Sequence, residues 1–537
     1  MAVRTAAQAL IEALEAEGVE TIFGIPGTHS LYLYDALVDS RIRHVLVRHE
    51  QAAAYMADGY ARSTGKVGVC LTTTGPATIN ALAALATSYS DSIPVLLLCT
   101  QIRSEYIGQD KGFFHEVPDQ LGMLRGVTGF CARPTDGQDA VAQLQEAMRQ
   151  ARSGRPRPVA LELPADVLSE KDDFHLPPPK ELTRPVPEPG DIDRVVEALA
   201  GAQRPVIWAG GGVTASGAEQ SLMHLAEALP APIVTTNLGK AAVPGDHPLC
   251  LGYTVGQKPV RQYLEQCDLM LAVGTRFSYL ATDCWTMKFP ETVIHIDIDA
   301  GVIGRNYDVT QGLVGDAGGI LEAILDRLGE RSPPPGDRRG EVAALKAAVH
   351  SIWTSEIPRE HQLIQDIRAA LPRSTIVAGD PSMCAYLAWQ MLDLYAPRSY
   401  LYPMGGATLG YGFPSALGAK AAHPDRPVVA ICGDAGFLFS CQELATAVQY
   451  DLNIVTLIFN DSGYGALRVQ QDDVFGRRSE VDLRSPDFVA LAESFGAAAQ
   501  RVEDLDQLQP VLSAALGHSC PTVIEVPVAL SVQNLTT

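Results

Sequence analysis

Short apolar runs alternate with longer segments of helical periodicity along the whole chain. The strand-like runs are Thr21–Ile25, Val67–Thr72, Val95–Leu98, Val206–Ala209, Leu269–Val273, Val293–Ile298, Val428–Cys432 and Ile454–Phe459. Strands that are apolar throughout and alternate with helices are typical of parallel sheets covered on both faces. The pattern therefore predicts an α/β protein built from doubly wound parallel sheets, with an amphipathic helix close to the first residue.

Two proline-rich stretches divide this pattern into three segments of similar size. They are His175–Gly190 and Gly329–Glu341, and their prolines can continue neither a helix nor a central strand. Each segment between them has the length of one domain, since domains usually have about 100–200 residues. We predict an N-terminal domain over residues 1–180, a middle domain over 190–330 and a C-terminal domain over 345–537.

The charge and the cysteines limit the partners and the compartment. The net charge is −21, from 41 basic and 62 acidic residues, so the chain should repel nucleic acid and anionic membranes. No uncharged apolar run reaches the ~18 residues of a membrane span, and the first residues do not read as a signal peptide. The ten cysteines form no C-x-x-C pair, which is typical of buried thiols in a reducing compartment. We expect a cytoplasmic protein that acts on a small molecule.

The most informative stretch runs from Val428 to Arg468. It predicts a buried strand, a turn at Gly433–Gly436, a helix over Ser440–Tyr450 and a second strand over Ile454–Phe459. Ligands of open α/β sheets bind at the carboxyl ends of such strands. The amide groups of a glycine turn can also bind phosphate oxygens there.

Two carboxylates follow the two strands, Asp434 after the first and Asp461 after the second. Beside a diphosphate these like charges would repel, and a Mg²⁺ ion shared between carboxylates and phosphates removes the conflict. The backbone carbonyl of Gly463 could complete the protein ligands. The stretch therefore predicts a site for a diphosphate and a magnesium ion.

This stretch resembles the motif of thiamine-diphosphate-dependent enzymes, in which Gly-Asp-Gly is followed about 27 residues later by Asn-Asn. Here Asp461 follows Asp434 by 27 positions. The match departs in two places, because Ala435 replaces the usual glycine and Asp461 replaces an asparagine. The resemblance implies that Asp434, Asp461 and Gly463 hold Mg²⁺ and that Gly433, Asp434, Ala435, Gly463 and Tyr464 contact thiamine diphosphate.

An N-terminal stretch, Val45–Arg62, is similar to the part of this family that carries its activating glutamate. In the family that residue binds a pyrimidine nitrogen of the cofactor held by the partner subunit, and Glu50 stands at the matching position. An isolated His-Glu pair would instead indicate a surface cap or salt bridge. The turns Phe23–Gly27 and Thr73–Asn80 also match family turns near the cofactor. They add five implied cofactor contacts, Pro26, Gly27, Thr74, Gly75 and Asn80.

The resemblance covers nearly the whole chain, in the order pyrimidine-binding, middle and diphosphate-binding domain, and is closest to the acetolactate-synthase-like branch. It implies an enzyme that makes or breaks the carbon–carbon bond next to the carbonyl of a 2-oxo acid, with a homodimer as the minimum unit and a homotetramer expected. Decarboxylase and carboligase outcomes both stay open, and an acetolactate synthase catalytic subunit is one alternative. A catalytically silent regulatory homologue and a flavin or nicotinamide oxidoreductase are the alternatives from other classes.

Three further stretches concern the substrate and the shape of the cofactor. Gly405–Pro414 resembles the segment that bends the cofactor, where Leu409 would wedge between its rings and the carbonyl of Ala407 would accept a hydrogen bond from its amine. Phe114-His115-Glu116 matches neither the Phe-Gln-Glu of acetolactate synthases nor the His-His of pyruvate decarboxylases, and this departure favours a decarboxylase or lyase. His115 would shuttle a proton or serve only the structure, with His29 as a second candidate and Phe114 facing the substrate.

After the metal motif, Gln471 and Asp472 stand where the family places substrate-facing residues. Asp472 and Asp473 could pair with a cationic substrate tail such as a guanidinium. They could equally form a solvated helix face, which is the preferred interpretation.

The middle segment raises the question of a flavin. Ala209–Val213, Thr235–Lys240 and Val273–Phe277 resemble the FAD-binding middle domain of acetolactate synthase. Many relatives keep this fold without the flavin, and a glycine-rich turn alone is weak evidence. FAD is therefore the less favoured alternative.

Overall fold

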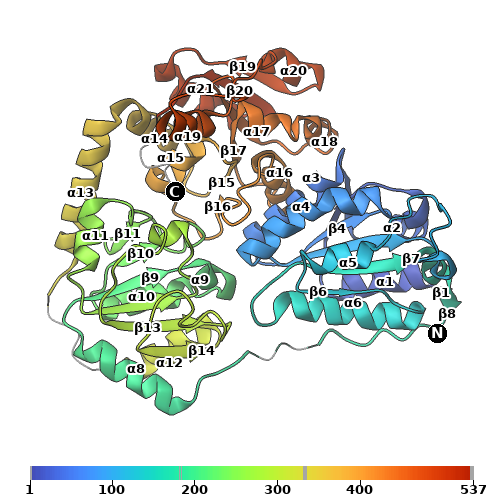
Figure 1. Ribbon diagram of the computed structural model, residues 1–537, viewed down its shortest axis with the longest axis horizontal. Helices are drawn as coiled ribbons and strands as arrows, with labels where there is room; N and C mark the ends of the chain where they lie inside the picture. Colours follow the sequence, from blue (N-terminus) through green and yellow to red (C-terminus); the bar gives the residue numbers. More distant parts are fainter. Residues whose placement is uncertain (1–2, 181, 183, 330–335, 532–537) are drawn as a thin grey trace.

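The computed structural model describes residues 3–180, 182, 184–329 and 336–531. Three six-stranded parallel sheets, each flanked by helices, follow one another along the chain (Figure 1). The predicted fold class is confirmed, and each predicted strand coincides with an observed one. The described residues of the first proline-rich stretch lie between β8 and α8 up to Glu188, and its last two residues, Pro189 and Gly190, begin α8. Residues 181 and 183 of this stretch and 330–335 of the second lie outside the described residues.

The N-terminal sheet has the strand order β3-β2-β4-β5-β7-β6. Its strands are β2 (Thr21–Gly24), β3 (Arg43–Leu46), β4 (Gly68–Thr72), β5 (Val95–Gln101), β6 (Phe130–Ala132) and β7 (Val159–Pro164). Its α-helices are α1 (Ala6–Ala16), α2 (Leu31–Val38), α3 (Glu50–Thr64), α4 (Pro76–Asp91), α5 (Gln120–Arg125), α6 (Gly137–Arg152) and α7 (Ala165–Ser169). A short antiparallel pair, β1 (Arg4–Thr5) with β8 (Lys171–Asp172), joins the two ends of this domain.

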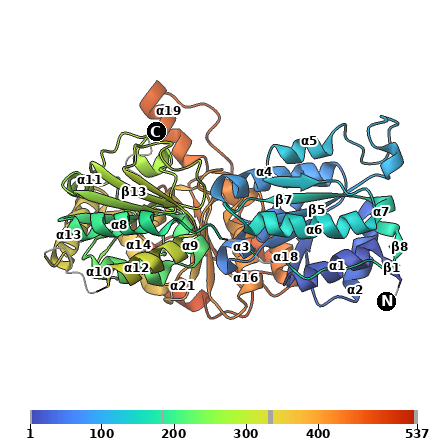
Figure 2. The ribbon, with the colours of Figure 1, turned by 90° about the horizontal axis from the view of Figure 1, so that it is seen from below.

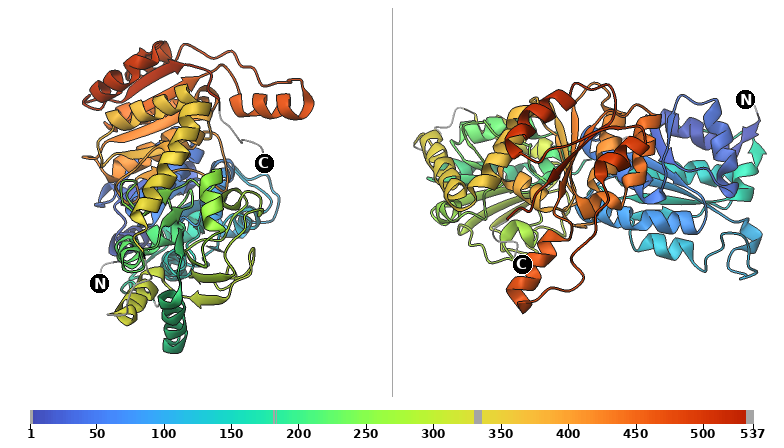
Figure 3. Two further views of the ribbon diagram at one scale, coloured as in Figure 1. Left: turned by 90° about the vertical axis from the view of Figure 1, so that its left-hand side faces the viewer. Right: turned by 90° about the horizontal axis from the view of Figure 1, so that it is seen from above.

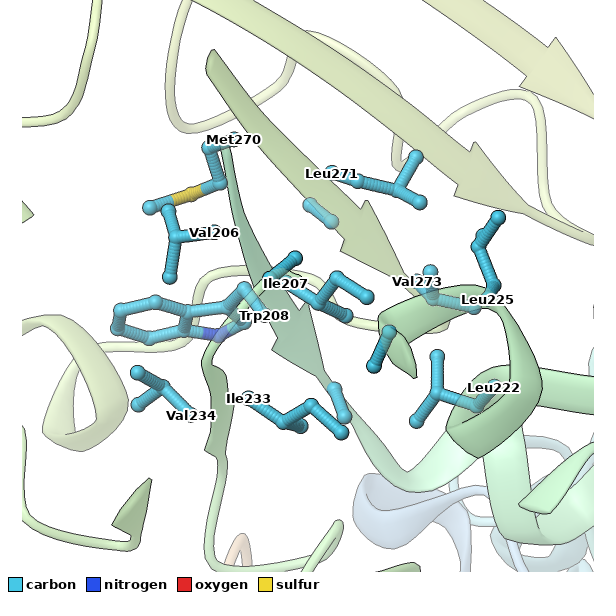
Figure 4. Close-up of a cluster of buried hydrophobic side chains, with 14 of the residues drawn as sticks. Val206, Ile207, Trp208, Leu222, Leu225, Ile233, Val234, Met270, Leu271 and Val273 are labelled. Carbon is cyan, nitrogen blue, oxygen red and sulfur yellow. The ribbon is translucent and has the colours of Figure 1, made fainter. Parts of the chain in front are cut away.

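The middle sheet has the order β11-β10-β9-β12-β13-β14. Its strands are β9 (Pro205–Ala209), β10 (Ile233–Thr235), β11 (Cys250–Gly252), β12 (Leu269–Val273), β13 (Thr292–Asp297) and β14 (Gln311–Val314). Its helices are α8 (Pro189–Gly201), α9 (Gly211–Ser216), α10 (Glu219–Ala228), α11 (Lys258–Leu264) and α12 (Ala317–Leu328). Figure 4 shows Trp208 of β9 among the aliphatic side chains of neighbouring strands, where it is fully buried.

The C-terminal sheet has the order β16-β15-β17-β18-β20-β19. Its strands are β15 (Ile376–Gly379), β16 (Tyr400–Leu401), β17 (Val428–Gly433), β18 (Val455–Asn460), β19 (Ala498–Arg501) and β20 (Thr522–Pro527). The helices are α13 (Arg339–Glu356), α14 (Pro358–Ala370), α15 (Met383–Met391), α16 (Gly412–Ala422), α17 (Asp434–Leu438), α18 (Leu444–Gln449), α19 (Gly465–Phe475), α20 (Phe488–Ser494) and α21 (Leu508–Ala515). Helix α19 projects from the body of the molecule (Figures 2 and 3).

One predicted element differs from the structure. The turn expected at Gly433–Gly436 is instead the start of α17, which begins at Asp434 directly after β17. Gly433 is its extended N-cap, and a carboxylate in the first helical turn is favoured by the helix dipole. The helix expected over Ser440–Tyr450 begins as a 3₁₀ turn and continues as α18.

The N- and C-terminal domains pack through α3 and α16, which lie side by side (Figure 1). The two backbones approach so closely that a Cβ on Gly59 would lie 2.1 Å from the carbonyl oxygen of Ser415, and one on Gly418 would lie 2.0 Å from that of Met56. Only glycine fits at either position.

All ten cysteines are free, and within the described part of the chain no helix is long and apolar enough to cross a membrane.

Candidate functional site

A cavity of about 250 Å³ opens at the carboxyl edge of the C-terminal sheet. Strand β15 pairs with β16 on one side and with β17 on the other, so the chain reverses direction across the sheet at β15. The segments that follow β15 and β17 line the cavity, with Pro381–Met383 after the first and Gly433–Gly436 after the second. This is the switch point where open α/β sheets bind their ligands.

Backbone amide groups are presented to this cavity from two elements. Helix α15 begins beside it, with Ser382 as its N-cap and with the Ser382 hydroxyl accepting a hydrogen bond from the amide of Ala385. Gly433 and Ala435 bring the first turn of α17 to the same wall. Free amides and the positive end of a helix dipole suit a phosphate group. Ser382 and Met383 were not predicted from the sequence, although a serine before an apolar helix is an N-cap signal.

Two carboxylates face each other in this cavity. Asp434 is almost completely buried, and its Oδ2 accepts a hydrogen bond from the Ser485 hydroxyl at 2.6 Å. Partial burial and the neighbouring Asp434 carboxylate raise the pKa of Asp461, while Arg468, 3.5 Å from Asp461, opposes that rise. A divalent cation between two such oxygens would remove the repulsion, and hard oxygen ligands are those that Mg²⁺ prefers. The donor set therefore fits the ion that the sequence predicts.

The cavity brings together most of the C-terminal residues that the sequence singles out. Its lining includes Ala407, Leu409, Gly433, Asp434, Ala435, Asp461, Gly463 and Tyr464. Ala407 has a left-handed backbone with φ +45°, a conformation that a residue with a side chain adopts only where its surroundings impose it.

Helix α19 contributes one of its faces to the cavity, through Ala466, Leu467 and Gln470. Gln471 and Asp472 point elsewhere, since Gln471 accepts from the amide of Ser479 and Asp472 forms a bidentate ion pair with Arg478. Neither lines the cavity. Gln470, which the sequence did not single out, is the glutamine that does.

The predicted N-terminal residues form a second cluster. The His29 ring is buried, its Nδ1 lies 2.8 Å from the Thr74 hydroxyl, and its centroid is 5.9 Å from that of His115. Burial and the neighbouring His115 lower the pKa of His29. Gly75 permits this arrangement, because a Cβ there would lie 2.2 Å from the carbonyl oxygen of His115. Phe114 is 63% exposed beside them.

Glu50 lies at the first position of α3, where the Asn80 amide donates a hydrogen bond to its Oε2 at 2.9 Å. Pro26 is exposed and Gly27 packs against Thr73. Among the described residues, none of the N-terminal domain lines the cavity, which is built entirely from positions 381–530. The chain thus carries two separate groups of predicted site residues.

Comparison with known proteins matches all three domains. The models for the N-terminal, central and C-terminal domains of thiamine pyrophosphate enzymes match residues 4–123, 192–324 and 380–526. The chain belongs to the thiamine pyrophosphate enzyme family. It is 39% identical to the probable 2-ketoarginine decarboxylase AruI of Pseudomonas aeruginosa over 97% of this chain and 94% of that protein.

Two further relatives of this chain are named as acetolactate synthases. It is 38% identical to a probable acetolactate synthase large subunit of Methanocaldococcus jannaschii, over 97% of this chain and 91% of that protein. It is 34% identical to the large subunit of acetolactate synthase isozyme 3 of Escherichia coli, over 96% and 93%. The prediction of a thiamine-diphosphate-dependent enzyme of the decarboxylase or carboligase type, similar to acetolactate synthase, is confirmed.

The glycine turn of the middle domain offers little to a flavin diphosphate. The amide of Gly210 donates to the carbonyl of Val273, and the amide of Gly212 donates to that of Gly274. A Cβ on Gly210 would lie 2.1 Å from the Gly274 oxygen, so these glycines serve the contact between two turns. Both amides are therefore engaged within the middle domain.

Proposed function

We propose that this protein is a magnesium- and thiamine-diphosphate-dependent decarboxylase of a 2-oxo acid. The observation that carries the proposal is the cavity at the switch point of the C-terminal sheet, where Asp434 and Asp461 lie beside the amino end of α15. Asp434, Asp461 and the carbonyl of Gly463 would hold Mg²⁺, and the amides after Ser382 and Gly433 would bind the diphosphate. When bound, thiamine diphosphate supplies a carbon nucleophile and an electron sink for cleavage next to a carbonyl.

Three residues would orient and activate the cofactor. Ala407 lines the cavity with a left-handed backbone, and its carbonyl would accept the pyrimidine amine, while Leu409 would keep the two rings apart. Glu50 would hold a proton at a pyrimidine nitrogen, and Asn80 orients its carboxylate. A rigid carboxylate at the start of a helix suits this task because its position is fixed by the helix.

A second copy of the chain would complete the site. The cavity holds the diphosphate residues, while Glu50, His29 and His115 belong to the other group. Large apolar side chains are exposed beside both groups, with Phe439 and Leu467 near the cavity and Ile79 and Phe114 near the group of Glu50, His29 and His115. Contact with a second copy would remove these side chains from water. We propose a homodimer as the minimum active unit, assembling further into a homotetramer.

The outcome of the reaction depends on the protonation that follows loss of carbon dioxide. His29 and His115 lie together with the Thr74 hydroxyl, and a lowered pKa keeps His29 neutral, able to accept as well as donate a proton. His115 would deliver the proton, which favours aldehyde release. His115→Ala is expected to lower aldehyde formation about 10²-fold, while carbon dioxide release in a single turnover is retained. If His115→Ala lowered aldehyde formation and carbon dioxide release equally, His115 would not be the residue that delivers the proton.

The substrate is proposed to carry a positively charged side chain. A relative of 39% identity is named for 2-ketoarginine, and helix α19 carries two carboxylates past the cavity. Asp472 is paired with Arg478, whereas Asp473 follows Gln470 by one helical turn on the cavity side and has no ion-pair partner among the described residues. A guanidinium tail extending from the cavity would meet Asp473.

The test is carbon dioxide release from a panel of 2-oxo acids with and without added thiamine diphosphate and Mg²⁺. We expect cofactor-dependent release that collapses in Glu50→Gln, with 5-guanidino-2-oxopentanoate as the best substrate. Asp473→Asn should raise KM for that acid roughly three- to tenfold and leave an uncharged acid unaffected, and Asp472→Asn is the matched control. Release that survives in Glu50→Gln would refute the mechanism, and equal effects of the two Asn variants would refute the substrate assignment.

A further inference from the structure

A buried ionic network connects the N-terminal helices to the loop that lines the cavity. The Arg62 Nε lies 2.6 Å from Asp58 Oδ1, and its Nη2 lies 2.9 Å from Asp91 Oδ2. All three side chains are at most 6% exposed. Three charges this deeply buried cost much desolvation energy, which their mutual pairing must offset.

Three outer contacts of this network end on the loop that leads to α16, and a fourth, from the Ser88 hydroxyl to Asp58 Oδ2, stays on α4. The backbone amide of Gly405 donates to Asp91 Oδ1 at 2.7 Å, and the Tyr411 hydroxyl donates to Asp58 Oδ1 at 2.8 Å. Arg62 Nη1 donates to the carbonyl of Tyr402 at 3.1 Å. The network therefore holds the loop at its beginning and at its end.

The middle of the loop is seated on the same two helices. The Tyr55 hydroxyl of α3 donates to the Thr408 hydroxyl at 2.7 Å, and Thr87 of α4 lies 3.1 Å from it. Gly405 and Gly406 must be glycines here, because their Cβ atoms would lie 2.0 Å from the Ser90 hydroxyl and 2.5 Å from that of Thr87. Ala407 and Leu409 thus have their positions set by α3 and α4, although their own domain is the C-terminal one.

We propose that Asp58, Arg62 and Asp91 are positioning residues that fix the loop Tyr402–Tyr411 against the cofactor bound in the same chain. The proposal rests on the function proposed above. The two halves of α3 then have different tasks. Its first residue, Glu50, serves the cofactor of the partner subunit, whereas Asp58 and Arg62 in its second half serve the cofactor of their own chain. The network thereby determines how well the loop is preorganised for binding.

Asp91→Asn is the decisive variant. It leaves Arg62 paired with Asp58, so no buried charge is left alone, and it keeps the size of the side chain. Gly405 and Arg62 donate to different oxygens of Asp91. In asparagine one of these atoms becomes an NH₂ donor, which cannot accept, so one link is broken. The matched control is Glu17→Gln, which changes the buried partner of Arg152 within the N-terminal domain.

The measurement is the Kd for thiamine diphosphate in the presence of Mg²⁺, on cofactor-free protein, together with the unfolding temperature. We expect the Kd to rise at least tenfold in Asp91→Asn and to stay unchanged in Glu17→Gln. If Asp91→Asn does not fold, Tyr411→Phe removes one contact more gently and should raise the Kd in the same direction. An unchanged Kd in a folded network variant overturns the proposal, whereas a wild type that binds no thiamine diphosphate refutes the proposed function itself.

Co-expression of Glu50→Gln chains with Asp91→Asn chains tests which cofactor the network serves. A mixed dimer has one site that joins the intact loop of one chain to the intact Glu50 of the other, in roughly a quarter of all sites. We expect activity above that of either variant alone at cofactor concentrations below the raised Kd. Activity no higher than the better variant would show that the network acts through Glu50, and would overturn its assignment to the loop.

Discussion

Glu443 provides a quantitative test of how the two outer domains are joined. It is completely buried between the C-terminal domain and the segment that leads into α3. Its two carboxylate oxygens accept from the amide of Arg48 at 3.0 and 3.2 Å, and Oε2 also accepts from the Thr446 hydroxyl at 2.6 Å. These bonds only partly replace the lost water, so burial raises the pKa of Glu443 from 4.5 to about 7. The substitution Glu443→Gln removes this titrating group and keeps the size of the side chain.

The size of the effect follows from that pKa. Because the pKa is higher in the folded than in the unfolded protein, the folded state binds the proton more tightly. The resulting stabilisation is fully present below pH 4.5 and is lost as the pH rises through 7. The whole shift corresponds to about 3 kcal/mol, of which about 2.5 kcal/mol falls between about pH 5 and about pH 8. The glutamine of the variant has no proton to lose, so the stability of the variant relative to wild type should rise by this amount over that range.

Thermal unfolding of both proteins across this pH range measures the effect. If the C-terminal domain unfolds as one unit, the unfolding temperature of Glu443→Gln minus that of wild type should rise by roughly 5–10 °C from about pH 5 to about pH 8. Other titrating groups cancel in this difference. A difference that stays flat with pH would refute the reasoning, because Glu443 would then have the same pKa in the folded and the unfolded chain.

Three further outcomes test the proposed site. Asp461→Ala should raise the Mg²⁺ concentration for half-maximal activity about 10–100-fold, measured by titrating the metal into apo-enzyme, and an unchanged requirement would exclude Asp461 as a ligand. Leu409→Ala should lower kcat about 10²-fold while the cofactor still binds, because the rings lose the side chain that orients them. If Leu409→Ala weakened cofactor binding as strongly as it lowered kcat, Leu409 would have a packing role only. The purified protein should show no flavin absorbance, since Gly210 and Gly212 use their amides within the middle domain.

Local sequence patterns determined most of the fold. Strands such as Val428–Gly433 are uninterrupted apolar runs, and such runs are recognisable because both faces of a parallel sheet are covered. The spacing of Asp434 and Asp461 was equally informative, because adjacent parallel strands bring their carboxyl ends to one edge. The start of α17 was misjudged, since a glycine-rich segment indicates a turn even where a helix begins at its second residue.

The parts of the site that could not be predicted depend on residues far apart in the sequence. Arg62 meets Asp91 and the carbonyl of Tyr402 only after α3 has packed against α4 and α16. Buried charges have no periodic signature, and single-sequence patterns give the expectation that acids and arginines are exposed. Ser382 belongs to the cavity because β15 lies next to β17, and strand order is not contained in either strand alone.

The structure also explains where the chain departs from the glycine pattern of its family. Ala435 lines the cavity, and its methyl group is accommodated at the start of α17. The next residue has no such freedom, because a Cβ on Gly436 would lie 1.8 Å from Oδ2 of the buried Asp380. The other oxygen of Asp380 accepts from the amide of Gly412, where the loop Tyr402–Tyr411 enters α16. Gly436 is therefore required by the carboxylate that anchors this loop, whereas position 435 tolerates a side chain because it faces the cavity.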